Sequence, residues 1–370
     1  MHPVVMLARR SRSIVMALMA CVPLSLNAQR GGSSSREVHL MVPVDSTGLR
    51  VFVRHLPPAK GTAIRGRSPV LFVHGASFPS ALAAAFRFDG HSWMDDLANQ
   101  GFDVWALDFL GYGGSDRYRE MAAPAEQHPP LGRAPEAARQ IAAAVERIVA
   151  LTGVSRVSLI AHSWGTIPAG LYSGEHPERV DRLVLFGPVT QRAPSEPPAA
   201  AAPAPAHWLI TEEDQRSRFF GYLPKGERPV LDTRHFSVWG PAYMATDPES
   251  DTRTPASVRI PAGPIADFDD AWSGRLPFDP AKVRAPTLII RGEWENVTTD
   301  ADARWLFDAL TGSPVRRDVK ISRGSHVMHL EESRIQLYRE VAAFLQADDT
   351  PPKPAPDRPT QPGAAPRRSR

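Results

Sequence analysis

One serine of this sequence lies between a buried strand and a helix, where a hydroxyl group can act as a nucleophile. A buried strand is predicted over residues 156–160 and a helix from Trp164, so Ser163 occupies the corner between them. The N–H groups and the positive dipole end of that helix would face the serine and stabilise developing negative charge. A serine hydroxyl is a poor nucleophile at neutral pH, and it needs a base that an acid orients.

The residues around Ser163 resemble the nucleophile elbow of the α/β-hydrolase family, whose usual form is Gly-x-Ser-x-Gly. Gly165 occupies the second glycine position, whereas Ala161 stands at the first. Both positions need small side chains because the serine is held in a strained turn. The resemblance implies an α/β fold with a mostly parallel, doubly wound sheet and a helical cap insertion. It also implies the chain order serine, acid, histidine.

The acid and the histidine of the family follow two later strands. The turn after Gly292 resembles the family's strand-end turn, in which the acid falls three residues after the glycine; this position is Glu295, and Glu293 is its rival. The loop with His326 and His329 resembles the family's histidine loop, in which the first histidine is catalytic. The resemblance therefore implies Glu295 and His326 as the partners of the serine, with His329 as the alternative base.

The oxyanion of an acyl-transfer reaction needs preorganised N–H donors. The resemblance implies that one donor belongs to Trp164, directly after the nucleophile. The other is expected in the loop after the strand that ends at His74, where Ala76 is the first choice and Ser77 the alternative. The imidazoles of His74 and His162 are expected to be structural rather than catalytic.

A serine at the elbow also limits the class of reaction that the site could catalyse. Haloalkane dehalogenases and epoxide hydrolases of this fold carry aspartate there, so Ser163 indicates hydrolysis of a carboxylic ester, or a related acyl bond, through an acyl-enzyme. Two alternatives stay open. Prolyl aminopeptidases of this fold also have Ser-Trp-Gly at the elbow and acidic cap residues, as Glu212 and Glu213 are here. A non-catalytic binding protein on a hydrolase scaffold is the other alternative.

Strands and helices alternate over residues 37–189 and 284–346, which predicts the core, while the proline-rich segment 190–283 breaks the rhythm and predicts the cap. With the Trp164 side chain, aromatic cap residues are expected to bind the apolar acyl group of a small-molecule substrate, or to form the cap's own core. These residues are Trp208, Phe219 and Trp239. Predicted core strands are 69–75, 102–108, 156–160, 182–186, 286–292 and 317–322, and predicted helices are 92–100, 134–151, 301–310 and 332–345.

The first 28 residues resemble a secretory signal peptide. Three arginines between positions 9 and 12 precede the apolar run 14–26, which is too short for a stable membrane span. Removal of residues 1–28 would give a periplasmic or secreted protein. A lipid anchor at Cys21 is the alternative, because residues 18–21 resemble a lipoprotein cleavage box.

Composition excludes several other classes of function. The net charge of +3 falls to zero when the three arginines of the signal are removed, so nucleic-acid binding is not expected. Cys21 is the only cysteine, which rules out a disulfide within the chain. His326 and His329 have no third ligand at motif spacing, so neither a metal nor another cofactor is expected. The proline-rich tail 347–370 is predicted to be disordered, and the oligomeric state stays open.

Overall fold

The computed structural model describes residues 36–44, 48–62, 68–193, 204–221 and 223–348. The predicted signal peptide, Cys21 and the tail beyond Asp348 lie outside the described residues. Within them, no helix is both long and apolar enough to cross a membrane.

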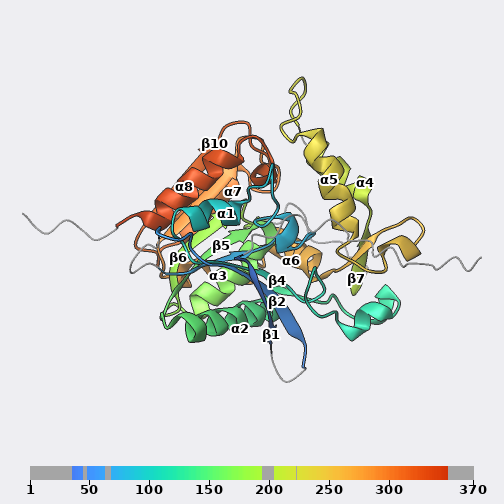
Figure 1. Ribbon diagram of the computed structural model, residues 1–370, viewed down its shortest axis with the longest axis horizontal. Helices are drawn as coiled ribbons and strands as arrows, with labels where there is room; N and C mark the ends of the chain where they lie inside the picture. The colour runs from blue at the N-terminus through green and yellow to red at the C-terminus, as the bar shows by residue number, and fades with distance from the viewer. Residues whose placement is uncertain (1–35, 45–47, 63–67, 194–203, 222, 349–370) are drawn as a thin grey trace, which may run out of the picture.

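An eight-stranded sheet forms the centre of the molecule, in the order β1-β2-β4-β3-β5-β6-β9-β10 (Figure 1). β2 pairs antiparallel with β1 and β4, and every neighbouring pair from β4 to β10 is parallel. The predicted mostly parallel sheet is therefore confirmed. The strands are β1 (Val38–Pro43), β2 (Arg50–Leu56), β3 (Val70–Val73), β4 (Val104–Asp108), β5 (Val157–His162), β6 (Val180–Phe186), β9 (Thr287–Gly292) and β10 (Arg316–Ile321).

Helices cover both faces of the sheet. α2 and α3 lie on one face, and α1 and α8 lie on the other (Figure 1). For this reason every residue of β3, β4, β5 and β9 is buried, in contrast to the half-exposed β1. Each fully buried Val, Leu or Ile side chain contributes about 1.5–3 kcal/mol to folding. The core helices are α1 (Trp93–Asn99), α2 (Ala134–Thr152), α3 (Thr166–Glu175), α7 (Asp300–Ala309) and α8 (Arg334–Gln346).

Local sequence signals fix several helix ends. α1 and α7 begin at capping boxes, in which Ser92 pairs with Asp95 and Thr299 pairs with Asp302. α2 ends at Gly153, whose left-handed φ of 73° suits a residue without a Cβ atom. These signals explain why the core helices begin and end within two residues of the predicted positions.

The segment between β6 and β9 forms a separate layer at the right of Figure 1. Two antiparallel strands, β7 (His207–Ile210) and β8 (Val258–Pro261), make a small sheet of their own. They are accompanied by α4 (Glu212–Phe220), α5 (Thr233–Met244) and α6 (Gly263–Trp272). The sequence pattern predicted a helix near α4. It did not specify α5, which tolerates Pro241 in its interior, or α6, which begins at a glycine and a proline.

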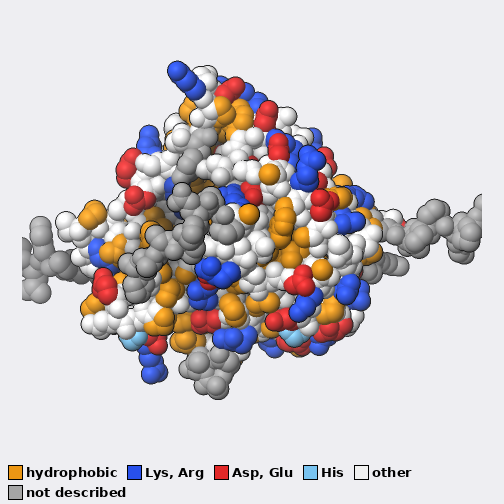
Figure 2. Space-filling view, turned by 180° about the vertical axis from the view of Figure 1, so that it is seen from behind, with side chains coloured by type: hydrophobic (Ala, Val, Ile, Leu, Met, Phe, Trp, Pro, Cys, Tyr) orange, Lys and Arg blue, Asp and Glu red, His pale blue; other side chains and the backbone are white. Residues whose placement is uncertain are grey.

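The cap layer is bonded to the core at several points. Ala206 donates its N–H to the carbonyl of Ala125, and Leu131 donates back to the carbonyl of Ala206. On α5, the indole of Trp239 donates to the carbonyl of Leu82, at 2.9 Å. Positive and negative side chains are interspersed on the face shown in Figure 2, in keeping with the small net charge.

Candidate active site

Ser163 lies at the sharp corner between β5 and the 3-10 helix η4 (Ser163–Gly165), which leads into α3. Its φ of 56° is in the left-handed region, which a residue with a Cβ atom adopts only under local constraint. The close packing at Gly165 supplies that constraint, because a Cβ atom there would lie 2.3 Å from the carbonyl oxygen of His74. Ala161 is fully buried in β5 opposite Val73, so alanine is accommodated where the pattern has glycine.

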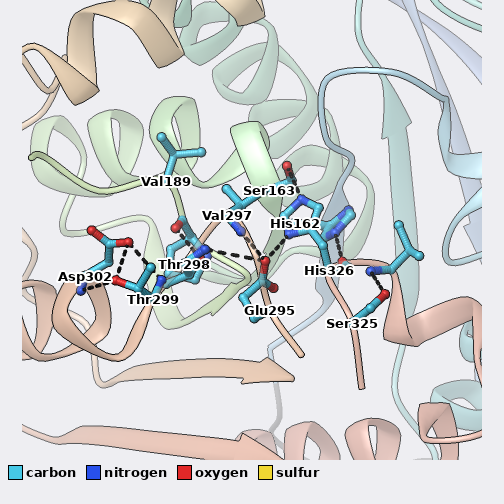
Figure 3. Close-up of polar contacts among 12 residues, drawn as sticks. His162, Ser163, Val189, Glu295, Val297, Thr298, Thr299, Asp302, Ser325 and His326 are labelled. Atoms are coloured by element: carbon cyan, nitrogen blue, oxygen red, sulfur yellow. Dashed lines mark hydrogen bonds and ion pairs between the residues drawn. The ribbon is translucent and has the colours of Figure 1, made fainter. Parts of the chain in front are cut away.

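The structure brings Ser163, His326 and Glu295 together in one hydrogen-bonded chain (Figure 3). The Ser163 hydroxyl lies 2.7 Å from His326 Nε2, and His326 Nδ1 lies 2.8 Å from Glu295 Oε1. Because the carboxylate can only accept, Nδ1 carries the proton and Nε2 is left to accept from the serine. This tautomer is the one that a general base for Ser163 requires.

Glu295 is enclosed and remains an acid of low pKa. Burial alone would raise its pKa, but the His326 ring and the N–H groups of Val297 and Thr298 outweigh burial, so the pKa lies below its usual value. The Val297 N–H donates to Oε1 at 2.8 Å. The carboxylate is therefore negative at neutral pH and orients the imidazole.

Two glycines allow the acid and histidine loops to meet. Gly292, at the end of β9, packs against the loop that follows β10. A Cβ atom at Gly292 would lie 2.0 Å from the carbonyl oxygen of Gly324. Gly187, after β6, has a φ of 54° and faces the Glu295–His326 contact. These close approaches explain how residues 31 positions apart form a hydrogen bond.

A buried carboxylate holds the histidine loop in place through hydrogen bonds. Glu331, fully buried, accepts from both the backbone N–H and the hydroxyl of Ser325, directly before His326. Burial raises the pKa of Glu331 to about 7, although the bonds from Ser325 oppose the rise. The His326 carbonyl in turn accepts from Nε2 of His162, at 2.9 Å. His162 is thus a structural neighbour of the triad, as expected.

The loop after β3 approaches the serine at Gly75, where a Cβ atom would lie 2.9 Å from the Ser163 Cβ. Ala76 follows in this loop, and its carbonyl accepts from the hydroxyl of Tyr112 at 2.6 Å. The backbone of Trp164 begins the first turn of η4. The two N–H groups expected to hold the oxyanion therefore belong to segments that converge at Ser163.

The Trp164 side chain differs from the expectation that it contacts substrate. It is buried, and its indole N–H donates to Oδ2 of Asp267 on α6 at 2.9 Å. Phe109 packs against the ring in an edge-to-face arrangement. A buried indole needs an acceptor, and Asp267 provides it from the cap. This geometry is compatible with the oxyanion role expected for the Trp164 N–H. The Trp164 side chain, by contrast, holds the elbow against α6.

Two of the three aromatic cap residues form one cluster beside the loop after β3. Phe219 and Trp239 are both buried, and both contact the ring of Phe78 edge-to-face, with centroids 5.9 and 5.2 Å away. Phe78 also stacks on His329 of the histidine loop. Trp208 lies on β7 and is 41% exposed, and no ring contact among the described residues includes it. The structure does not bring Trp208 together with the other two.

The residues that the sequence offered as alternatives, Glu293, His74 and His329, lie in other surroundings. Glu293 accepts from the backbone N–H of Arg323. Both nitrogens of His74 are engaged, with the Gly75 carbonyl at 2.7 Å and the Phe109 N–H at 3.0 Å. Burial, with the positive charge of His326 as a second cause, lowers the pKa of His329 to about 3. These positions are typical of structural residues.

Three residues near the site were not predicted from the sequence. Gly187 could have been recognised from the sequence as a turn residue, because it directly follows a buried strand. Arg218 on α4 donates to the Ser77 hydroxyl, next to Ala76. Glu331 and Arg218 could not be recognised from the sequence, because an acid after a histidine loop and an arginine on an amphipathic helix are usually solvated. Among the described residues, no group of three or more His, Cys, Asp or Glu side chains is arranged to hold a metal ion.

Comparisons with known proteins agree with this architecture. A sequence profile for the alpha/beta hydrolase fold matches residues 68–333. The serine hydrolase-like protein of Homo sapiens is 28% identical over 105 residues, which cover 26% of this chain and 46% of that protein. The match therefore spans less than half of the relative's own length.

Several solved structures share the fold. A serine hydrolase involved in carbazole degradation has a TM-score of 0.56 and 19% identity, covering 84% of this chain and 98% of its own. A bacterial membrane phospholipase A has a TM-score of 0.54 and 18% identity, with coverages of 84% and 86%. The thioesterase domain from the curacin biosynthetic pathway has a TM-score of 0.54 and 14% identity, with coverages of 84% and 99%. The profile match extends over more than half of the chain, and the chain belongs to the α/β-hydrolase fold family.

Proposed function

We propose that this chain is an exported serine hydrolase that cleaves carboxylic esters through an acyl-enzyme intermediate. The observation that carries the proposal is the continuous chain of short contacts from Ser163 Oγ through the His326 ring to Glu295, at 2.7 and 2.8 Å. The order of the three residues along the chain is that of the fold family.

In the first half-reaction, Ser163 Oγ attacks the acyl carbon while its proton passes to His326 Nε2. The negative charge of Glu295 stabilises the imidazolium that forms. The N–H groups of Ala76 and Trp164 hold the oxyanion of the tetrahedral intermediate. When the intermediate collapses, the ester C–O bond breaks, and the leaving alcohol takes the proton from His326.

In the second half-reaction, a water molecule replaces the alcohol. His326 removes a proton from the water as its oxygen attacks the acyl carbon of the Ser163 ester. Collapse of this second intermediate releases the carboxylic acid and returns the proton to Ser163. The cycle consumes one water and leaves the enzyme unchanged, and it needs no cofactor.

The aromatic cluster of Phe78, Phe219 and Trp239 supports an apolar portion in the substrate. Its rings come from the loop after β3 and from the cap helices α4 and α5, and they pack against one another where the cap meets that loop. Export rests on the sequence of residues 1–28 alone. The mass of the mature N-terminus tests it: cleavage after Ala28 supports a signal peptide, and a lipid on Cys21 supports an anchor.

A fluorophosphonate probe tests the nucleophile directly, because it forms a covalent bond with an activated serine. We expect labelling of the purified protein at Ser163, located by peptide mass, and no labelling of Ser163→Ala. Unmodified Ser163 in a folded sample would favour the non-catalytic binding protein. The Ser163→Ala variant should retain the circular dichroism spectrum and melting temperature of the wild type.

A substrate panel then separates the reaction classes. The panel contains aryl esters, thioesters, lactones and proline arylamides, each measured as kcat/KM for the wild type and Ser163→Ala. We expect the aryl esters to be the best substrates. Preference for proline arylamides would instead support the aminopeptidase, the reading suggested by Glu212 and Glu213. In the structure the Glu212 carboxylate packs against Gly240 of α5, whereas Glu213 is exposed.

A further inference from the structure

The cap helix α6 holds the side chain of the residue that follows the nucleophile. The indole N–H of Trp164 donates to Oδ2 of Asp267 at 2.9 Å, and both side chains are buried. Trp164 belongs to the elbow at the edge of the sheet, whereas Asp267 comes from the cap, 103 residues further along the chain. One hydrogen bond therefore joins the cap to the turn in which an oxyanion donor is expected.

The carboxylate of Asp267 is itself held by the start of α2. Its Oδ2 also accepts from the backbone N–H of Ala134 at 2.7 Å, and its Oδ1 accepts from Nε of Arg133 at 2.5 Å. α6 begins in close contact with the same segment, because a Cβ atom at Gly263 would lie 2.3 Å from the carbonyl oxygen of Leu131. The Trp164 indole is thus offered an acceptor whose position is fixed.

Further contacts join the Trp164 ring to the loop after β3, which is expected to supply the second oxyanion donor. Phe109 packs edge-to-face on the indole, with ring centroids 5.2 Å apart. The Phe109 N–H donates to Nε2 of His74 at 3.0 Å, so Nδ1 of His74 carries the proton and donates to the Gly75 carbonyl at 2.7 Å. Ala76 follows directly. The two segments that carry the expected oxyanion donors therefore share one buried set of contacts, which ends at the cap aspartate.

The bond between Asp267 and the indole matters for the backbone of Trp164 as well as for its ring. A buried indole N–H without an acceptor is costly, so the ring would turn towards another acceptor. Because the ring and the backbone N–H of Trp164 are attached to the same Cα atom, such a rotation would shift the N–H. An oxyanion donor is effective only when it is preorganised, and small displacements of catalytic groups are costly.

We propose that Asp267 is a positioning residue for the oxyanion hole, which acts through the Trp164 indole to fix the direction of the Trp164 N–H. This inference rests on the proposed esterase function. It makes α6 a part of the catalytic arrangement. Its contribution is made in the transition state and is the same for every ester, so it does not select among substrates.

Trp164→Phe tests the proposal, because it removes the indole N–H and leaves the bonds from Ala134 and Arg133 to Asp267 in place. We expect kcat on an aryl ester to fall by about tenfold, since the donor is displaced rather than lost. KM should change by less than about threefold, because the interaction is made only in the transition state. Fluorophosphonate labelling carried to completion counts the active molecules, so unfolded protein does not enter kcat.

A trifluoromethyl ketone reports on the oxyanion hole itself. Ser163 Oγ adds to its carbonyl carbon, the proton passes to His326 Nε2, and the carbonyl oxygen becomes an oxyanion. We expect its Ki to rise by about tenfold in Trp164→Phe, in parallel with the loss of kcat. The matching trifluoromethyl carbinol has no carbonyl group and forms no oxyanion, so its Ki should stay unchanged.

Trp105→Phe is the matched control for the loss of a buried indole. Trp105 is buried on β4, its N–H donates to Oδ2 of Asp103 at the same distance of 2.9 Å, and its ring stacks on His55 of β2. This strand lies on the side of β4 away from β5. Trp105→Phe should lose stability but keep kcat and the Ki of the ketone.

A second pair of variants tests the aspartate. Asp267→Leu removes the acceptor and should lower kcat at least as much as Trp164→Phe does. Asp267→Asn keeps one acceptor oxygen for the indole, and it should recover most of the lost kcat although its contact with Arg133 is weakened. If Asp267→Leu does not fold, the comparison of Trp164→Phe with Trp105→Phe still decides the question.

Two outcomes overturn the inference. If Trp164→Phe loses stability but keeps kcat and the Ki of the ketone, Asp267 only fastens α6 to the core. If Trp105→Phe loses as much kcat as Trp164→Phe, the effect belongs to any buried indole. Both results leave fluorophosphonate labelling of wild-type Ser163 intact, whereas absence of that labelling would instead contradict the esterase function itself.

Discussion

Gly187 lies so close to the carboxylate of Glu295 that a Cβ atom at position 187 would stand 3.0 Å from Oε2. The same atom would lie 3.0 Å from Nδ1 of His326, and the φ of Gly187 is 54°. A glycine after β6 thus permits the contact between Glu295 and His326, although it contributes no functional group.

Gly187→Ala should lower kcat by about 10-fold. The added methyl group pushes apart the two residues that orient the base, and small displacements of catalytic groups are costly. The positive φ adds about 1 kcal/mol of strain. The measurement is kcat on an aryl ester, together with the free energy of unfolding.

Gly153→Ala is the control for backbone strain. Gly153 also has a positive φ, 73°, but a Cβ atom there has no neighbour within 4 Å. It should lose about 1 kcal/mol of stability and keep full activity per folded molecule. Equal kcat values for the two alanine variants would contradict the role given to Gly187.

Glu295→Gln should reduce kcat by about 10³- to 10⁴-fold, with little change in stability. The amide can donate as well as accept, so it no longer selects the tautomer of His326 that accepts from Ser163. Glu293→Gln is the control, because Glu293 bonds to Arg323 rather than to the histidine. A similar loss of kcat in both variants would show that the acid has been assigned incorrectly.

Glu331 should make stability depend on pH. Its pKa is about 7 in the folded protein and near 4.5 in the unfolded chain, so its contribution is complete below about pH 4.5 and is lost as pH rises towards 7. The free energy of unfolding of the wild type relative to Glu331→Gln should therefore fall by up to about 3 kcal/mol between pH 4.5 and 8.

Urea titrations at several pH values measure this difference. Glu332→Gln is the neighbouring control: Glu332 is exposed and pairs with Arg228, so its effect should be small across the range. A pH-independent difference between the wild type and Glu331→Gln would contradict a titrating group at this position.

Asp267→Ala should destabilise the protein by about 2–5 kcal/mol. Asp267 is fully buried and accepts from the Trp164 indole, the Arg133 side chain and the Ala134 N–H. Its removal leaves buried donors without acceptors. Thermal or urea unfolding measures the loss.

Asp270→Ala provides the comparison, because Asp270 also pairs with Arg133 and is partly exposed. The Asp270→Ala substitution should lower the free energy of unfolding by less than about 1 kcal/mol. If both variants lost equally little stability, the buried link between the elbow and α6 would have no energetic role.

Much of the core could be predicted from the sequence, because its signals are local. Apolar runs such as 286–292 predict strands buried on both faces, and the capping boxes of α1 and α7 fix helix starts within a few residues. The positions of Ser163, Glu295 and His326 follow from a family resemblance at three strand ends. Parallel strands bring their carboxyl ends to one edge of a sheet, so these residues were expected to meet there.

The cap could not be predicted in the same way. Its prolines interrupt the periodic patterns, and its helices depend on partners that are distant in the chain. Trp164 was expected to face substrate, yet its indole bonds to Asp267, 103 residues away. Trp208 and Phe219 look equivalent as aromatic cap residues, but only Phe219 joins the cluster beside the loop after β3.

The sequence by itself therefore predicted most strands of the sheet and the three residues that meet at its edge, since each prediction depends on residues that are neighbours along the chain. The tertiary structure alone decided what surrounds them. The bond from Arg218 to Ser77 joins residues 141 positions apart, and a contact of that kind depends on how the cap packs on the core. The residues that meet at Ser163 could be predicted from local motifs, whereas the contacts between the cap and the core form only when distant segments pack together.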